Sequence, residues 1–157
     1  MIKVKQHNKD IIVILDNIRS AFNVGAILRT ADGSGVKKVY LCGITPDVKH
    51  PKILKTALGA EEYIETKSLK TTQEAISTCR LEGYTIVSVE QVENSVSIEE
   101  VKSTSKLCLI FGNELSGVSH EILEMSDRVI EIPMFGKKNS LNVATTVGIA
   151  LYYLVLN

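Results

Sequence analysis

Short apolar runs alternate along the chain with stretches in which apolar residues recur every three or four positions. The runs predict strands at 11–15, 38–42, 84–89, 107–111 and 128–132. Those at 11–15 and 107–111 are continuously apolar, as expected of strands buried on both faces. The intervening segments favour helices at 23–34, 51–58, 71–82, 119–125 and 142–155. This alternation predicts a single α/β domain over residues 1–157, with a mostly parallel sheet flanked by helices.

Two of the predicted helices have informative surfaces. The helix at 23–34 carries one apolar stripe and places Gly25, Arg29 and Asp32 on the opposite face. The simplest interpretation of Arg29 is therefore a solvated side chain paired with Asp32. The helix at 142–155 is apolar on nearly every side, so it must be buried on nearly every side. In a small domain this favours a homodimer through the C-terminal helix, with a plain core helix as the alternative.

Composition narrows the classes of function. Lys and Arg total 18 and balance 18 Asp and Glu, so any basic surface for a nucleic acid must be local. No apolar segment reaches the roughly 18 residues of a membrane span. The three cysteines are far apart, which favours reduced thiols in a cytoplasmic protein. The three histidines lack metal-ligand spacing, so we expect no metal.

Three polar segments follow predicted strands, at 16–31, 112–118 and 133–142. Parallel sheets bind ligands beyond the carboxyl ends of their strands, and each segment combines Gly and Asn with hydrogen-bonding side chains. Ordinary turn and cap roles would explain any one of them. Together they favour a site for a polar small molecule. No Gly-x-Gly-x-x-Gly follows a strand and no phosphate-binding Gly-x-x-x-x-Gly-Lys-Ser/Thr occurs, which argues against dinucleotide binding and nucleotide hydrolysis.

The same segments contain three longer motifs: NVGAILRTA (23–31), FGNELSGV (111–118) and IPMFGKKNSLNVATTVGIALY (132–152). In this order they resemble the motifs of the SpoU (TrmH-type) RNA ribose 2′-O-methyltransferases of the SPOUT superfamily. The resemblance extends from about Ile11 to Leu154. It implies an S-adenosylmethionine-dependent enzyme, a C-terminal trefoil knot, and a homodimer with active sites at the subunit interface. The knot follows from the resemblance alone, because connection rules make threaded chains rare.

The resemblance also implies site residues. The catalytic positions of the family match Asn23, Arg29, Glu114, Ser140 and Asn142, and its cofactor contacts match Val89, Gly112, Ile132, Met134 and Leu141. An arginine stays protonated in proteins, so we expect Arg29 to hold a phosphate or stabilise alkoxide charge, while another group or the phosphate takes the proton. We expect Glu114 to orient Asn23 or Arg29, and Ser140 with Asn142 to fix the ribose.

The RNA substrate is less sharply indicated. Short basic clusters that could face a phosphate backbone contain Lys37, Lys38, Lys49, Lys52, Lys55, Lys137 and Lys138. The first predicted strand begins near residue 11, which predicts a catalytic domain without a separate RNA-binding domain and slightly favours tRNA over rRNA. Two alternatives are a catalytically silent RNA-binding dimer on the same scaffold and a flavodoxin-like nucleotide-binding domain.

Overall fold

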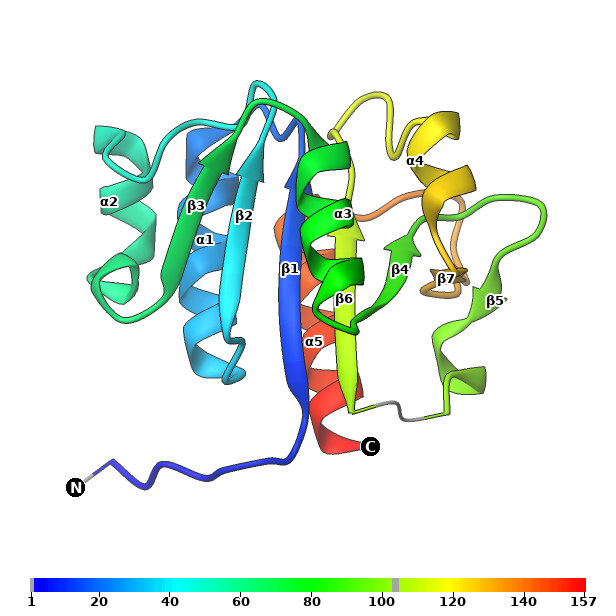
Figure 1. Cartoon of the computed structure of the whole chain (residues 1–157), viewed down its shortest axis with the longest axis horizontal. Coiled ribbons are helices and arrows are strands. Elements are labelled where there is room, and N and C mark those ends of the chain that lie inside the picture. Colours follow the sequence, from blue (N-terminus) through cyan, green and yellow to red (C-terminus); the bar gives the residue numbers. More distant parts are fainter. Residues whose placement is uncertain (1, 103–104) are drawn as a thin grey trace.

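The computed structural model describes residues 2–102 and 105–157. At its centre lies a seven-stranded sheet of order β3-β2-β1-β6-β4-β7-β5 (Figure 1), and every neighbouring pair is parallel. The strands are β1 (Asp10–Asp16), β2 (Lys38–Cys42), β3 (Glu65–Leu69), β4 (Thr85–Val89), β5 (Val96–Ser97), β6 (Lys106–Phe111) and β7 (Arg128–Glu131). The helices are α1 (Ala21–Gly33), α2 (Pro51–Ala57), α3 (Thr72–Leu81), α4 (His120–Met125) and α5 (Val143–Leu156), with short 3-10 turns at Ala60–Glu62 and Ile98–Glu100. The predicted α/β class with a parallel sheet is confirmed.

All five predicted strands and all five predicted helices are present, with ends shifted by at most two residues. Strands β3 and β5 were missed. β3 forms one edge of the sheet and, among the described residues, pairs only with β2. It is largely exposed, so it has no apolar pattern that would predict it. β5 has two residues, too few for any periodicity.

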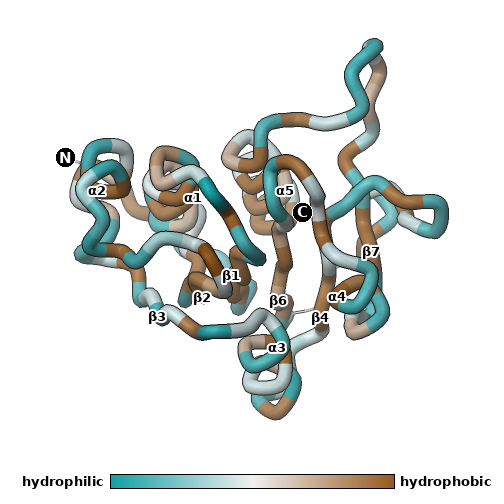
Figure 2. Tube along the Cα trace, turned by 90° about the horizontal axis from the view of Figure 1, so that it is seen from above, coloured by the Kyte–Doolittle hydropathy of each residue, from teal (hydrophilic) through white to brown (hydrophobic). Residues whose placement is uncertain are grey.

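Helices cover both faces of the sheet. Figure 2 shows α1, α2 and α5 on one face and α3 and α4 on the other. The alternation of side chains along β1 feeds both cores: Ile11, Val13 and Leu15 pack with the first set, and Ile12 and Ile14 with the second. A strand that is buried on both faces must be continuously apolar, which explains the apolar run from which β1 was predicted.

The close packing of α1 against α2 depends on a glycine. A Cβ built on Gly25 would lie 1.9 Å from the Oγ1 of Thr56, in a helix whose backbone also crowds the position. Gly25, Arg29 and Asp32 lie on the face opposite the apolar stripe, as predicted, but Gly25 is buried there because its missing side chain lets α2 approach. Arg29 and Asp32 are exposed, but no ion pair joins them within the described residues, so that predicted pairing was wrong.

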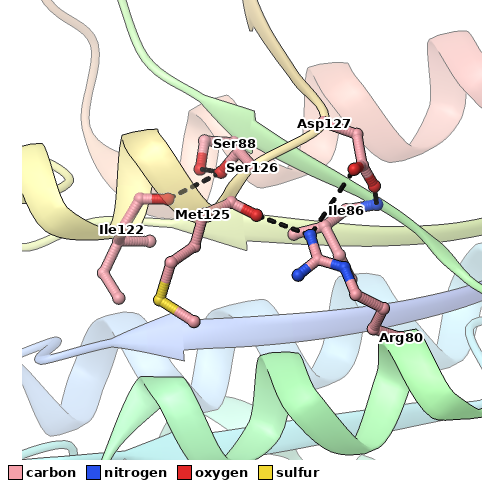
Figure 3. Close-up of polar contacts among 7 residues, drawn as sticks. All are labelled: Arg80, Ile86, Ser88, Ile122, Met125, Ser126 and Asp127. Carbon is pink, nitrogen blue, oxygen red and sulfur yellow. Dashed lines mark hydrogen bonds and ion pairs between the residues drawn. The ribbon is translucent and has the colours of Figure 1, made fainter.

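A polar clamp holds the start of β7 against β4 (Figure 3). The Nη2 of Arg80, on α3, donates to the carbonyl of Met125 at 2.6 Å and lies 3.5 Å from the Oδ1 of Asp127. The Oδ2 of Asp127 accepts from the backbone N–H of Ile86 at 2.8 Å, and the backbone N–H of Asp127 donates to the Ile86 carbonyl at 2.8 Å. The clamp thereby ties the beginning of β7 to both α3 and β4.

The cysteines are buried free thiols, as predicted: Cys42, Cys79 and Cys108 all pack in the core beneath α3 and α4. Within residues 2–102 and 105–157, no helix is both long and apolar enough to cross a membrane. The same residues contain no group of three or more His, Cys, Asp or Glu side chains that could hold a metal ion.

Candidate active site

A cavity of about 500 Å³ lies at the carboxyl ends of β4, β6 and β7. Its walls come from the end of β4, from the loop at 111–118 and from the loop at 132–143. The family resemblance implied five cofactor contacts on these segments, and all five of these residues line the cavity: Val89, Gly112, Ile132, Met134 and Leu141. The three strand ends therefore meet at one site, as the topology of a parallel sheet requires.

The loop after β6 is a tight turn built from glycine. A Cβ on Gly112 would lie 2.3 Å from the backbone of Gly117 and Val118, so no other residue fits this position without moving the chain. Gly117 has a positive φ of 67°, which other residues rarely adopt. Together the two glycines bring main chain, rather than side chains, to this wall of the cavity.

Asn113 anchors this turn to the loop after β1, a role that sequence reasoning missed. Its Nδ2 donates to the carbonyl of Asn17 at 2.7 Å. Its Oδ1 accepts from the backbone N–H groups of Leu115 at 2.9 Å and Ser116 at 3.0 Å. An asparagine two residues after a strand is the available signal, because its amide serves both as a turn former and as a donor to a second loop.

Glu114 is held at the beginning of α1. Its carboxylate accepts from the backbone N–H groups of Arg19 and Ser20, each at 3.0 Å, and from the Nδ2 of Asn23 at 3.2 Å. Burial alone would raise the pKa of Glu114, but these hydrogen bonds to the ionised form outweigh it, so the pKa lies below its usual value. The carboxylate is therefore ionised at neutral pH, and its hydrogen bond to the Nδ2 of Asn23 fixes the orientation of that side chain.

Asn142 fixes the other end of Asn23. As the N-cap of α5, it accepts through its Oδ1 from the backbone N–H groups of Ala144 at 2.9 Å and Thr145 at 3.2 Å. Its Nδ2 donates to the Oδ1 of Asn23 at 3.2 Å. The result is a continuous hydrogen-bonded chain from Asn142 through Asn23 to Glu114, which links residues from all three motifs.

The two remaining predicted catalytic residues lie differently. Ser140 lines the same cavity and is exposed, and its hydroxyl makes no hydrogen bond within the part of the chain described. Arg29 lies six residues beyond Asn23 on α1, about 9 Å along the helix axis. It lines a second, open hollow between α1, α2 and α5 beside Lys55 and Tyr152. One copy of the protein thus brings four of the five predicted catalytic residues together at the cavity, and Arg29 lies on another surface.

These features define the class of protein. A model of the SpoU rRNA Methylase family matches residues 10–152, so the chain belongs to the SpoU methylase family, as the three motifs suggested. The tRNA (guanosine(18)-2′-O)-methyltransferase of Aquifex aeolicus is 35% identical over 150 residues, which are 95% of this chain and 70% of that protein. The Escherichia coli (strain K12) protein of the same name is 30% identical over 143 residues, 91% of this chain and 62% of that one.

A solved structure has the same fold. The AdoMet-bound rRNA methyltransferase from Sinorhizobium meliloti superimposes with a TM-score of 0.86 at 28% identity, over 94% of this chain and 56% of the other. The chain therefore spans between about half and 70% of the length of these relatives. Family and fold follow directly from these matches.

Proposed function

We propose that this protein is an S-adenosylmethionine-dependent methyltransferase that modifies a ribose 2′-hydroxyl of tRNA. The observation that carries the proposal is the chain from Asn142 through Asn23 to Glu114 at the edge of a cavity of about 500 Å³. Cavities of this size are typical of small-molecule sites. The Aquifex aeolicus and Escherichia coli relatives are named tRNA methyltransferases, which supports tRNA over rRNA as the substrate.

The cavity suits the proposed cofactor in size and in the nature of its walls. Val89, Ile132, Met134 and Leu141 supply apolar surface, and the turn at Gly112 supplies main chain. Small-molecule sites commonly combine an apolar lining with a few fixed polar groups. When bound, S-adenosylmethionine supplies an electrophilic methyl group on a positively charged sulfur.

The chain's own polar residues would align the ribose for in-line displacement. Asn23 is held at both ends of its amide, by Glu114 and by Asn142, so its position is set before substrate binds. The hydroxyl of Ser140 is exposed at the cavity and available to bind the ribose. Alignment of two reactants accounts for a large share of the barrier in reactions of this kind, so a rigid Asn23 is catalytically useful.

We further propose a homodimer in which Arg29 of one subunit reaches the cavity of the other. Arg29 lies outside its own cavity, beside Tyr152 of α5. Tyr152 and Ile149 expose 44% and 40% of their surface on α5, whose buried side is formed by Val147, Ala150, Leu151 and Leu154, so the helix presents a second, apolar face to a partner. A two-fold interface through α5 would bring each Arg29 toward the partner's site, where its fixed charge would hold a phosphate or stabilise the developing alkoxide.

Three further expectations belong to this proposal. Threading of the C-terminal segment into a trefoil knot is implied by the family. The exposed lysines at 49, 52, 55, 137 and 138 would contact the RNA backbone. Buried free thiols fit a reducing cytoplasm.

The test has two stages. Calorimetry should detect binding of S-adenosylmethionine to the purified protein, and labelled methyl groups should then appear in tRNA as nucleotides resistant to alkaline hydrolysis. Arg29→Ala should abolish transfer, whereas Arg128→Ala, an exposed arginine on β7, should leave it unchanged. Absence of cofactor binding, or transfer by Arg29→Ala near the wild-type rate, would contradict the proposal.

A further inference from the structure

Glu90 is a second carboxylate of the cavity, on the wall formed by the end of β4. It follows β4 directly and lines the cavity beside the loop after β6. Its Oε1 accepts from the backbone N–H of Gln91 at 2.9 Å, and its Oε2 accepts from the backbone N–H of Val118 at 3.0 Å. A Cβ on Gly117 would lie 2.3 Å from the same Oε2, so the absence of a side chain there makes room for the carboxylate. Glu90 is therefore held in place at the cavity wall.

The charged side chains of the cavity wall are all negative. The lining contains two carboxylates, Glu90 and Glu114, and no Lys, Arg or His. Neither carboxylate belongs to an ion pair within residues 2–102 and 105–157. Lys137 and Lys138 lie on the exposed part of the 132–142 loop, outside the lining. A cavity with this charge favours a ligand that carries positive charge.

We propose that Glu90 makes the cavity selective for the positively charged cofactor over its neutral product. The inference rests on the proposed function. S-adenosylmethionine carries a sulfonium, an ammonium and a carboxylate, so its net charge is positive. During transfer the methyl carbon leaves sulfur and bonds to the ribose oxygen, whose proton passes to a neighbouring RNA phosphate or to water. The electron pair of the broken bond stays on sulfur and neutralises it, so S-adenosylhomocysteine has no net charge.

Selectivity of this kind acts at product release. The attraction between Glu90 and the sulfonium exists before transfer and disappears with it, which favours replacement of the product by fresh cofactor. The interaction of one carboxylate with one positive charge across a partly hydrated cavity changes the relative affinity of the two ligands by about three- to tenfold. Glu114 adds to the same field, but it also holds Asn23, so Glu90 is the residue at which charge selectivity is separable from catalysis.

The experiment compares two unreactive ligands. Sinefungin carries an ammonium group where the cofactor has its methyl sulfonium, and S-adenosylhomocysteine is neutral at that position. Calorimetry gives both dissociation constants for the wild type, for Glu90→Gln and for Glu93→Gln, an exposed control outside the cavity. We expect Glu90→Gln to lower the preference for sinefungin about three- to tenfold with little change in S-adenosylhomocysteine affinity, and Glu93→Gln to match the wild type. Glu90→Asp, which keeps the charge, should retain the preference.

Two results would overturn the inference alone. An unchanged ratio in Glu90→Gln would mean that its charge does not reach the ligand. An equal loss of affinity for both ligands, shared by Glu90→Asp, would mean that Glu90 only supports the loop through Val118. Failure of the wild type to bind either ligand would instead contradict the proposed function, and the inference would fail with it.

Discussion

Replacement of Asn142 by alanine perturbs the stability of α5 and the position of Asn23 at once. The side chain accepts two backbone hydrogen bonds at the start of the helix and donates one to Asn23. Loss of an asparagine N-cap costs about 1 kcal/mol of unfolding free energy, and the bond to Asn23 adds little because both side chains are reached by water. In a chain of 157 residues, this corresponds to a fall in Tm of about 2–4 °C.

The effect on activity should be much larger than the effect on stability. Without its anchor, Asn23 keeps only the hydrogen bond to Glu114, and a displacement of about 1 Å at a reacting centre costs about 100-fold in rate. Urea unfolding measures the first effect, and methyl transfer to tRNA, assayed well below the Tm of Asn142→Ala, measures the second.

Asn142→Asp separates the two roles. Aspartate keeps the cap acceptor and adds negative charge at a helix N-terminus, so the unfolding free energy should equal or exceed that of the wild type. It lacks the N–H that binds Asn23, so methyl transfer should fall about as far as in Asn142→Ala. Wild-type activity in Asn142→Asp would refute the positioning role, and wild-type stability in Asn142→Ala would refute the cap.

Three further predictions concern packing, pH and the clamp at β7. Gly25→Ala should destabilise the protein by about 2–3 kcal/mol in urea unfolding, because the new methyl would meet Thr56 at 1.9 Å; an unchanged midpoint would contradict the packing of α1 on α2. Because the pKa of Glu114 is lowered in the folded state, its carboxylate stabilises the fold above pH 4.5, the ordinary pKa, and this stability is lost as the pH falls through the folded-state pKa. The difference in unfolding free energy between wild type and Glu114→Gln should therefore shrink in acid. A difference that does not change with pH would contradict the hydrogen bonds of Glu114 to Arg19, Ser20 and Asn23. Asp127→Ala should cost about 1–3 kcal/mol by leaving the Ile86 N–H without its acceptor, whereas no loss would show that water replaces it.

Sequence alone was sufficient for most of the fold because the central strands are buried on both faces. The continuous apolar runs at β1 and β6 predict strands buried on both faces, which is how the structure has them. The edge strand β3 was not predicted, because its exposed residues show no apolar pattern. The packing of α2 against Gly25 was not predicted, because hydrophobic periodicity depends on side chains and gives no signal at a residue that has none.

The site divides in a similar way. Residues after strands were predictable, since parallel topology brings strand ends together, and Glu114 and Asn142 indeed reach the same cavity. The supporting roles of Asn113 and Glu90 depend on hydrogen bonds between loops that are distant in sequence. The position of Arg29 outside the cavity was also not predictable from the sequence. Helical spacing shows that it faces away from the apolar stripe, but spacing on one chain cannot show what a second subunit would bring to that face.

The shared active site is the central claim of the proposed function, and heterodimers of differently tagged subunits test it most directly. One heterodimer pairs an Arg29→Ala subunit with a Glu114→Gln subunit, and the other pairs a wild-type subunit with one carrying both changes. If Arg29 acts across the interface, the first retains one intact site and about half the wild-type transfer activity, and the second retains none. The reverse pattern, with activity only in the second heterodimer, would show that each chain uses its own Arg29 and would contradict the account.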